Sequence, residues 1–397
     1  MPSAGTTRRA LPAGIWALGL VSLFMDLSSE MIHALLPAFL VGTLGVSAFA
    51  LGWIEGVAEA TASISKIFSG AWSDRIGQRK PLVLLGYGLA ALTKPLFPLA
   101  QHATTAIAAR WIDRIGKGIR GAPRDALVAD ITSPEQRGAA YGLRQSMDTA
   151  GAFLGPLLAT GLMLLAAFDI RAIFWVAVIP AFVALLVLTI FVREPEHSRP
   201  VATPRAPLFA GWREFPASFW RLFALAMLFT LMRFSEAFLV LRAQQAGLAI
   251  AWLPMTLVIM SLTYMLTAYP AGWLSDRLPR HRMLALGCAV MVVADLLLAF
   301  GRTETIVLVG IAIWGVHMGL TEGLLAALTA DASPAHMRGT AFGLINLARG
   351  LMLLVASALA GALWSGIGSY ATFIAGAIAA ALTAVAALTI PAAPPPR

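Results

Sequence analysis

Long apolar stretches follow one another along almost the whole chain, and this pattern constrains the fold more than any other feature. Of the 397 residues, 59% are hydrophobic and 12% are charged, whereas a soluble domain has about 25% charged residues. A helix needs about 20 apolar residues to cross a bilayer, and the stretches are too long and uniform for the strands of a membrane barrel. The sequence therefore excludes a soluble globule and predicts an all-α polytopic protein with the lipid bilayer as its partner.

Hydropathy, helix breakers and charge together predict twelve transmembrane helices. The approximate ranges are 15–41, 48–71, 81–100, 104–127, 139–165, 171–192, 219–241, 248–273, 283–301, 305–329, 340–364 and 369–390. The first range is much longer than a signal-peptide core, so we expect it to be retained. A polar, Pro-rich stretch over 193–218 predicts a cytoplasmic linker between two six-helix bundles, over 1–192 and 219–397.

Basic residues predict the orientation in the membrane. The loops on the opposite side from the termini contain only Arg171, Arg242 and Arg302. The termini, the linker and the alternate loops hold fifteen, namely Arg8, Arg9, Arg75, Arg79, Lys80, Arg137, Arg193, Arg199, Arg205, Arg213, Arg277, Arg280, Arg282, Arg338 and Arg397. Because positive loops stay inside, we expect both termini and the linker to be cytoplasmic, in a bacterial inner membrane.

The two halves repeat each other. The segment GAWSDRIGQRK at 70–80 corresponds to GWLSDRLPRHR at 272–282, and ADITSPEQRGAAYGL at 129–143 corresponds to ADASPAHMRGTAFGL at 330–344. Ser29-Glu30 and Ser235-Glu236 match at a similar shift. Corresponding loops in the same order predict parallel repeats, and transporters of this design bind substrate between the halves near the midplane.

With these motifs the chain resembles the major facilitator superfamily over essentially its whole length. The family signature between helices 2 and 3 is similar to Gly70, Asp74, Arg75, Gly77, Arg79 and Lys80, and it recurs at Gly272, Asp276 and Arg277. The resemblance implies a gating role for Asp74, Arg75, Arg79, Lys80, Asp276 and Arg277, since a contact made in one conformation only shifts the inward-open and outward-open populations.

Further motifs also resemble those of family members. Arg114 and Gly118 are similar to an arginine motif associated with proton coupling, although Lys117 and Arg120 are charged where relatives usually are not. Gly151, Gly155 and Pro156 resemble the glycine-proline signature of exporters and are expected to set helix packing. The strings FMDLSSEM at 24–31 and DRIGKGIRGAPRDA at 113–126 resemble a bacterial exporter subgroup with some members tied to nickel resistance.

Ionisable residues inside the predicted helices indicate where the chemistry lies, because each costs about 3 kcal/mol at the bilayer centre and needs a partner, water or a function. In the first half these include Asp26, Glu30, Glu55, Glu59, Lys66, Lys94, Arg110, Asp113, Arg114, Lys117, Arg120, Arg124, Arg144 and Asp148. The second half holds six: Arg221, Arg233, Glu236, Asp295, Glu322 and Arg349.

The acids predict proton coupling. Asp26 and Glu30 share one side of a helix, as do Glu55 and Glu59. Two carboxylates in one low-dielectric site repel and lose hydration, so such a pair can bind and release a proton. We assign coupling to these four acids with Arg114. The alternative is that each acid forms a structural pair with a cation of the fourth or fifth helix.

Other polar residues are predicted to line the substrate cavity. Asp113, Lys117, Arg120 and Arg124 form one stripe at spacings of four, three and four, which we expect to face the cavity or the acids, unless Arg120 and Arg124 extend to the cytoplasmic surface. Arg144 and Asp148 are expected to pair locally. The remaining cavity candidates are His33, Glu236 and Glu322.

The sequence favours a secondary transporter that exports a small molecule in exchange for protons, as a monomer. The alternatives are uptake of a small anion, efflux of a metal or metal complex, and a membrane sensor that does not transport. The single Cys288 provides no Cys-based metal cluster, and no metal constellation is specific. The net charge of +9 is explained by loop topology rather than by nucleic acid. No phosphate-binding loop, cofactor or enzymatic activity is predicted.

Overall fold

A computed structural model of the chain describes residues 11–76, 78–133, 136–167, 169–194, 214–275, 278–333 and 338–389. The regular structure of these residues is helical. The helical segments are α1 (Ala13–His33), α2 (Leu36–Ala38), η1 (Phe39–Thr43), α3 (Ala48–Ile76), α4 (Lys80–Thr93), α5 (Leu96–Leu99), α6 (Ala103–Ile131), α7 (Arg137–Leu165), α8 (Ile170–Phe191), α9 (Ala217–Leu231), α10 (Ala237–Gln245), η4 (Ile250–Trp252), α11 (Met255–Ser275), α12 (Arg280–Phe300), α13 (Glu304–Ala332), α14 (Arg338–Gly366) and α15 (Ser369–Leu388).

Each predicted range overlaps one or more of these segments, and nine stretches in the described residues are long and apolar enough to cross a membrane. The other three ranges correspond to α3, to α6 and to the pair α9 and α10. α3 and α6 contain much of the intramembrane charge, and α9 and α10 are both short. The protein is therefore an all-helical polytopic membrane protein. The predicted ranges that are not among these nine apolar stretches contain many charged residues or a break.

Several predicted ranges run through interruptions in the helices. α1 is followed by α2 and the π-helix η1, and α4 is separated from α5 at Lys94–Pro95. Pro95 has no N–H with which to continue the helical hydrogen bonds. α9 ends at Leu231 and α10 begins at Ala237, so residues 232–236 leave the helical path inside the second half.

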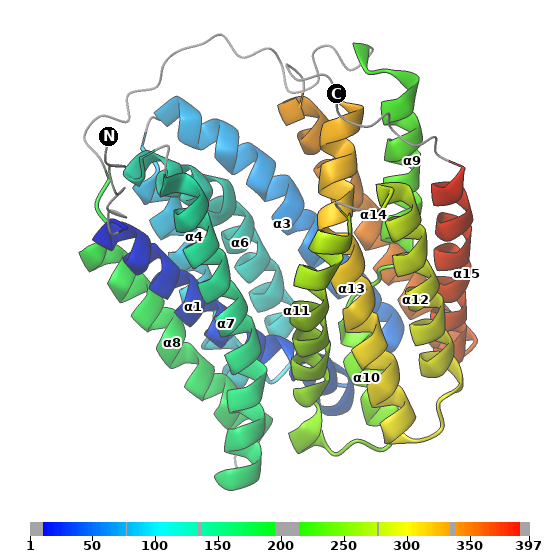
Figure 1. The fold of residues 1–397 in the computed structure, drawn as a ribbon. Coiled ribbons are helices and arrows are strands. Elements are labelled where there is room, and N and C mark those ends of the chain that lie inside the picture. The colour runs from blue at the N-terminus through cyan, green and yellow to red at the C-terminus, as the bar shows by residue number, and fades with distance from the viewer. Residues whose placement is uncertain are drawn as a thin grey trace, which may run out of the picture.

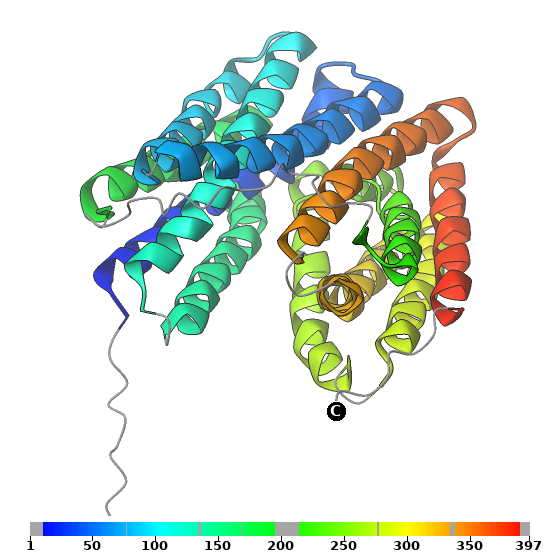
Figure 2. The same ribbon diagram turned by 90° about the horizontal axis from the view of Figure 1, so that it is seen from above.

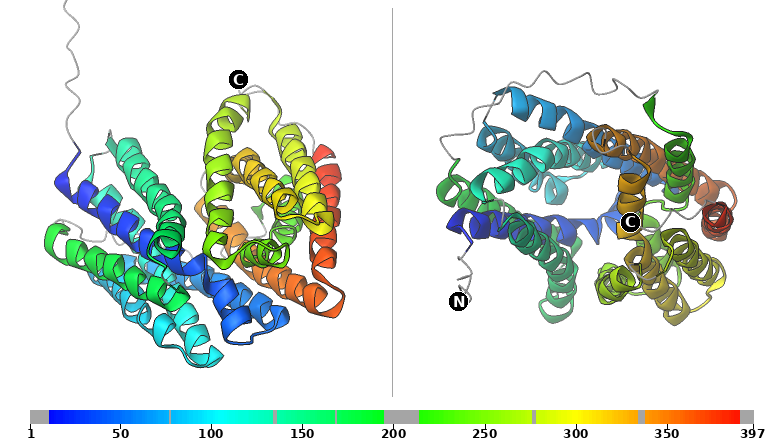
Figure 3. Two further views of the ribbon diagram at one scale, coloured as in Figure 1. Left: turned by 90° about the horizontal axis from the view of Figure 1, so that it is seen from below. Right: turned by 45° about the horizontal axis from the view of Figure 1, so that its top comes forward.

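The helices form two groups, α1–α8 and α9–α15, which lie side by side (Figures 1 and 2). Figure 3 shows the same separation from below. Within the first group, α1 packs on α7 and α8, and α6 packs on α3 and α4. In the second group, α12 packs on α13 and α15, and α13 packs on α11.

The two groups meet most extensively along α3 and α14. A Cβ added to Gly56 would lie 2.9 Å from the Cα of Leu354, and one on Gly361 would lie 2.6 Å from the carbonyl oxygen of Ala48. The Phe49 amide donates to Ser365 Oγ at 2.9 Å in the same region. These contacts join the start of α3 to the end of α14. Toward the other ends of the same two helices, the groups diverge (Figure 1).

Apolar side chains reinforce this junction. Ala34 and Ala38 of the first group pack into the large apolar cluster of the second group. Ala237 and Leu241 of α10 pack conversely into a cluster of first-group residues. The junction therefore closes one end of the space between the groups.

Candidate functional site

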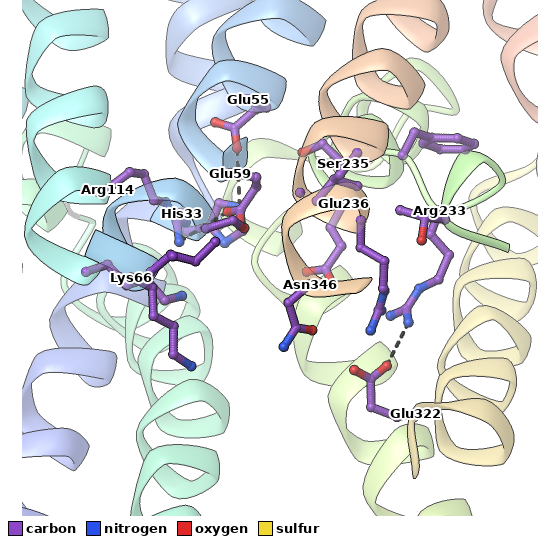
Figure 4. A pocket seen from close by; sticks show the side chains of 18 of the residues that line it. His33, Glu55, Glu59, Lys66, Arg114, Arg233, Ser235, Glu236, Glu322 and Asn346 are labelled. Carbon is purple, nitrogen blue, oxygen red and sulfur yellow. Dashed lines mark hydrogen bonds and ion pairs between the residues drawn. The ribbon is translucent and has the colours of Figure 1, made fainter. Parts of the chain in front are cut away.

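A cavity of about 720 Å³ lies between the two groups of helices. Its first wall comes from α1, α3 and α6, and its second wall comes from α9, residues 233–236, α13 and α14 (Figure 4). The acids on these walls are Glu30, Glu55, Glu59, Glu236 and Glu322, and the basic residues are His33, Lys66, Arg114, Lys117, Arg233 and Arg349. The site is thus a charged pocket formed by both halves, of the size that holds a small organic ligand.

Helical spacing explains why two of the elements expose so many polar groups. On α3, Glu55, Glu59, Ser63 and Lys66 follow one another at intervals of four, four and three, which places them on one face. On α14, Asn346 and Arg349 are three residues apart and face the cavity together. Each of these long helices therefore presents a polar stripe to the other half.

His33 lies at the centre of the first wall. Its Nδ1 is 3.2 Å from Glu30 Oε2, and its Nε2 is 4.0 Å from Glu55 Oε2. Arg110 donates to Glu55 from Nε at 3.1 Å and from Nη2 at 2.6 Å. The imidazole therefore stands between one acid that is partly exposed and another that is buried and held by an arginine.

Glu59 forms the second acid–arginine contact of this wall, with Arg114 Nη1 at 3.2 Å from its Oε1. Arg110 and Arg114 both belong to α6, and Glu55 and Glu59 both belong to α3. Two acids that are one turn apart on α3 thus contact two arginines that are one turn apart on α6. The alternative of structural pairing, which the sequence left open, is the geometry found for these two acids.

The second wall contains one matched pair and one unpaired acid. Arg233 Nη1 lies 2.7 Å from Glu322 Oε2, and its guanidinium carbon is 5.9 Å from the centroid of the Trp314 ring. Glu236 lies in the break between α9 and α10, and its carboxylate has no hydrogen bond or ion pair within the described residues. Figure 4 shows it across the cavity from Glu59.

Three members of the predicted stripe on α6 do not line the cavity. Asp113 is buried with Lys94 Nζ at 2.9 Å from its Oδ1, and the same ammonium contacts Ser29 Oγ at 3.0 Å. The guanidinium of Arg120 is stacked 4.6 Å from the centroid of the Tyr87 ring. Of the four residues in this stripe, Lys117 alone lines the cavity.

Arg124, the third of these, points into the first group of helices instead. It donates to Ser22 Oγ at 3.1 Å and lies 3.7 Å from Asp148 Oδ1. Asp148 also accepts from Arg144 at 2.6 Å, so the predicted local pair is present within a larger cluster. These side chains are kept from the cavity by the packing of α4 on α6. A Cβ on Gly86 of α4 would lie 2.6 Å from the carbonyl oxygen of Gly116, so α4 covers that side of α6.

Asp26 is also absent from the cavity wall. It is half-buried, one turn before Glu30, at the contact between α1 and α7. A Cβ on Gly151 would lie 3.1 Å from the Asp26 Cβ, and one on Gly155 would lie 3.0 Å from the Glu30 Cβ. Gly151 and Gly155, with Pro156 inside α7, therefore lie where α7 approaches α1 within the first half.

Among the predicted gating residues, Arg79 and Lys80 make contacts inside the first half. Arg79 Nη1 donates to Ser73 Oγ at 2.7 Å, and its Nε lies 3.4 Å from Asp130 Oδ2. The Arg79 and Lys80 amides donate to Glu194. This set of contacts ties the ends of α3, α6 and α8 together.

Arg75 is exposed at the end of α3, and Lys80 Nζ donates to the Thr189 carbonyl oxygen at 3.1 Å. Asp276 and Arg277 lie outside the described residues, as does the side chain of Asp74. Within the described residues, the structure therefore gives no contact between the predicted gating residues of the first half and the second half.

The cavity also contains residues to which the sequence gave no role. Lys66, Arg233, Asn346 and Arg349 all line it. The spacing of Lys66 from Glu55 and Glu59 was a usable signal, because all three fall on one face of α3. For Asn346 and Arg349 no comparable signal exists, since only the packing of α14 against α3 decides which face meets the cavity.

Among the described residues, no three His, Cys, Asp or Glu side chains are grouped so that they could hold a metal ion. Several charged groups of the cavity instead form acid–base contacts, as Glu59 does with Arg114 and Arg233 with Glu322.

Comparison with known proteins shows the family of the chain. The model of the Major Facilitator Superfamily matches residues 18–357 and, in a second match, 242–397. The chain belongs to this family. As a family member it is a multi-pass membrane protein that functions in transport, and the resemblance noted in its motifs is confirmed.

Relatives of this facilitator include an uncharacterized MFS-type transporter of Methanocaldococcus jannaschii, which is 31% identical over 96% of this chain and 96% of its own length. Another is the multidrug resistance protein MdtH of Edwardsiella ictaluri, 26% identical over 85% of this chain and 83% of its own length.

Solved structures show the same fold at low sequence identity. A peptide transporter POT has a TM-score of 0.80 and 16% identity, with 98% of this chain and 96% of that chain covered. The nucleoside transporter NupG has a TM-score of 0.80 and 11% identity, with 95% and 99% covered. These likenesses concern the architecture of the facilitator alone.

Proposed function

We propose that this facilitator exports a small organic molecule from a bacterial cell in exchange for protons. The two six-helix bundles, over 1–192 and 219–397 with a linker over 193–218, would rock about the cavity so that it opens to one side of the membrane at a time. The observation that carries this proposal is the position of His33 on the cavity wall, between Glu30 and Glu55.

The chemistry of this contact suits proton exchange. Glu30 is partly exposed at the cavity, whereas Glu55 is buried behind His33. An imidazole has two ring nitrogens, so it can accept a proton at one and release a proton at the other. A proton that enters at Glu30 changes the attraction between Glu30 and His33, and through His33 it changes the contact with Glu55. Glu59 and Arg114 complete the group, with Asp26 one turn away.

The conformation fits an inward-open state. The closed junction lies at the start of α3 and the end of α14, opposite the ends that the basic loops predict to be cytoplasmic. Cargo would therefore enter the cavity from the cytoplasm. The exporter-like glycine-proline motif and the relatives named as multidrug resistance proteins support export as the direction.

The proposal is tested in everted membrane vesicles that hold a respiration-driven pH gradient, with acridine orange as the reporter. Phenylalanine, N-acetylphenylalanine, phenylalanine amide, N-acetylphenylalanine amide and ethidium are the trial cargoes. We expect at least one of them to dissipate the gradient with the wild-type chain and to fail with Glu30→Gln. The exposed acid Glu304, in the first turn of α13, provides the matched control Glu304→Gln.

A double variant, Asp26→Asn with Glu30→Gln, provides the decisive comparison. Full dissipation of the gradient by this variant would remove the coupling assignment. Accumulation of the active cargo by intact cells, instead of extrusion, would replace export with uptake.

A further inference from the structure

In the described part of the chain, more basic than acidic side chains of the cavity lack an ion-pair partner. Arg114 is matched by Glu59, Arg233 by Glu322, and Glu30 by His33. Glu55 is held by Arg110 from behind the wall. Within the described residues, the charged groups of Lys66, Lys117 and Arg349 have no hydrogen bond or ion pair to a partner, and the carboxylate of Glu236 is the one acidic group of the wall in the same condition.

The three cations lie on both sides of the cavity. Lys66 belongs to α3, and its aliphatic stem runs beside Gly121 of α6, where an added Cβ would lie 3.4 Å from its Cδ. Lys117 is on α6, one turn from Arg114 and on the same face. Both side chains are exposed to the cavity.

Arg349 provides the third cation, from α14 in the second half. It is half-buried, and its Nε is buried without a hydrogen-bond partner. Glu322, an acid of the same wall, already accepts from Arg233 at 2.7 Å. A guanidinium carries five donors in a fixed fork, so the donors of Arg349 remain available to a group that enters the cavity.

We propose that the cargo carries an anionic group, a carboxylate or an oxyacid of similar charge, which binds between Lys66 and Lys117 of the first half and Arg349 of the second. This inference rests on the proposed function and names the class of its cargo. A cation cargo is disfavoured, because one unpaired acid faces three unpaired cations. Hydrogen bonds to charged groups are the stronger ones, so an anion that bridges the halves would satisfy donors that the protein itself leaves unmatched.

The rest of the wall indicates an apolar body for this anion. Ile67, Phe234, Trp314 and Leu353 line the same space. Pockets of about 300–1,000 Å³ bury drug-sized ligands, and the volume here, about 720 Å³, lies within that interval. The cargo is therefore an amphiphilic organic anion rather than an inorganic ion.

The test uses four molecules that share one aromatic body and differ in charge. They are N-acetylphenylalanine, an acid; phenylalanine, a zwitterion; phenylalanine amide, an amine; and N-acetylphenylalanine amide, which is neutral. Binding to the purified full-length chain in detergent is measured as the rise in melting temperature and as an affinity by isothermal titration. Ligands that bind the folded state preferentially stabilise it.

We expect the two molecules with a carboxylate to bind, and the amine and the neutral amide to bind at least about tenfold more weakly, because they lack the charged acceptor. Lys66→Gln, Lys117→Gln and Arg349→Gln should each weaken binding of N-acetylphenylalanine about tenfold, the effect of losing one hydrogen bond between charged groups. Lys66→Arg and Arg349→Lys should retain a larger part of the affinity. Arg302→Gln, at an exposed cation in an outer loop, is the matched control and should change nothing.

Preferred binding of phenylalanine amide or of the neutral amide would overturn the proposal, as would unchanged affinity in all three Gln variants. Failure of both carboxylates to bind at millimolar concentration also counts against it. Since no pH gradient is involved, these results are separate from proton coupling. An amine that dissipates the gradient in vesicles with the wild-type chain but not with Glu30→Gln would support proton-coupled transport while rejecting an anionic cargo.

Discussion

Arg110 holds Glu55 through two hydrogen bonds at the buried contact between α6 and α3, with Nε donating to Oε1 at 3.1 Å and Nη2 donating to Oε2 at 2.6 Å. The pair lies directly behind His33 and fixes the acid that the imidazole faces. Its loss would therefore affect both the folding of the first half and the shape of the cavity wall.

Replacement of Arg110 by Met should lower the free energy of unfolding by about 3 kcal/mol or more, because the Glu55 carboxylate would be left buried without its cation. Thermal melting of the purified protein in detergent measures the effect. Adding Glu55→Gln to the same chain should restore much of the stability, since no charge then remains unpaired. Equal melting temperatures for Arg110→Met and wild type would contradict this account.

Arg242 is a structural residue of the second half. Its Nε donates to the Leu298 carbonyl oxygen at 2.7 Å and its Nη2 to that of Gly301 at 2.5 Å, at the end of α12. Arg242→Ala should lower the free energy of unfolding by about 2 kcal/mol, the contribution of hydrogen bonds to a charged group. Arg302→Ala, at an exposed position in the loop between α12 and α13, is the matched control variant. A melting shift of similar size in both variants would reject the assignment.

Gly56 controls closure of the junction between α3 and α14. A valine there would collide with the backbone of Leu354, whereas a valine at Gly88 of α4 would meet open space. Gly56→Val should therefore disfavour the observed conformation and expose the cavity at its closed end. In a Cys288→Ser background, Asn346→Cys should become reactive toward an impermeant maleimide added outside the cell. Labelling that is equal in the Gly56→Val and Gly88→Val chains would show that this junction is not the barrier.

Asp113 should affect stability rather than binding of cargo. Its carboxylate contacts Lys94 at 2.9 Å away from the cavity, so Asp113→Asn leaves an ammonium buried without its counter-charge. We expect a loss of about 3 kcal/mol in unfolding free energy. The affinity of the folded protein for N-acetylphenylalanine should stay within a factor of about two, in contrast to the roughly tenfold loss with Lys117→Gln. Equal losses of affinity in the two variants would place Asp113 in the binding site after all.

Hydropathy was sufficient to predict the helical ranges, because the need for about 20 apolar residues per crossing leaves few alternatives. It did not indicate the break at 232–236, where the sequence Met-Arg-Phe-Ser-Glu contains no Pro or Gly. That break depends on tertiary packing: Phe234 packs against Phe373 of α15, and the Ser235 amide donates to Ser357 Oγ on α14. Neither partner is near in sequence.

The candidate site could be predicted only in part for a similar reason. Periodicity groups Glu55 and Glu59 on one face of α3, because that relationship is local, and the same spacing rule applied to Lys66 would have added it to this face. Periodicity also groups Asp113, Lys117 and Arg120, but it does not say what the face meets. The close approach of α4 to α6 at Gly86 takes Arg120 onto Tyr87 and leaves Lys117 at the cavity.

Each half places apolar side chains in the apolar cluster of the other half, and this packing affects the rate at which the transporter can change conformation. Ala34 and Ala38 sit in the hydrophobic cluster of the opposite half, and Ala237 and Leu241 do the same in return. Two rigid bodies cannot simply swing apart while each has a short helix anchored in the other. These short helical segments must first detach from the opposite half, which exposes apolar surface to water. The slow step of opening would therefore be this local detachment, and its rate would rise steeply with temperature.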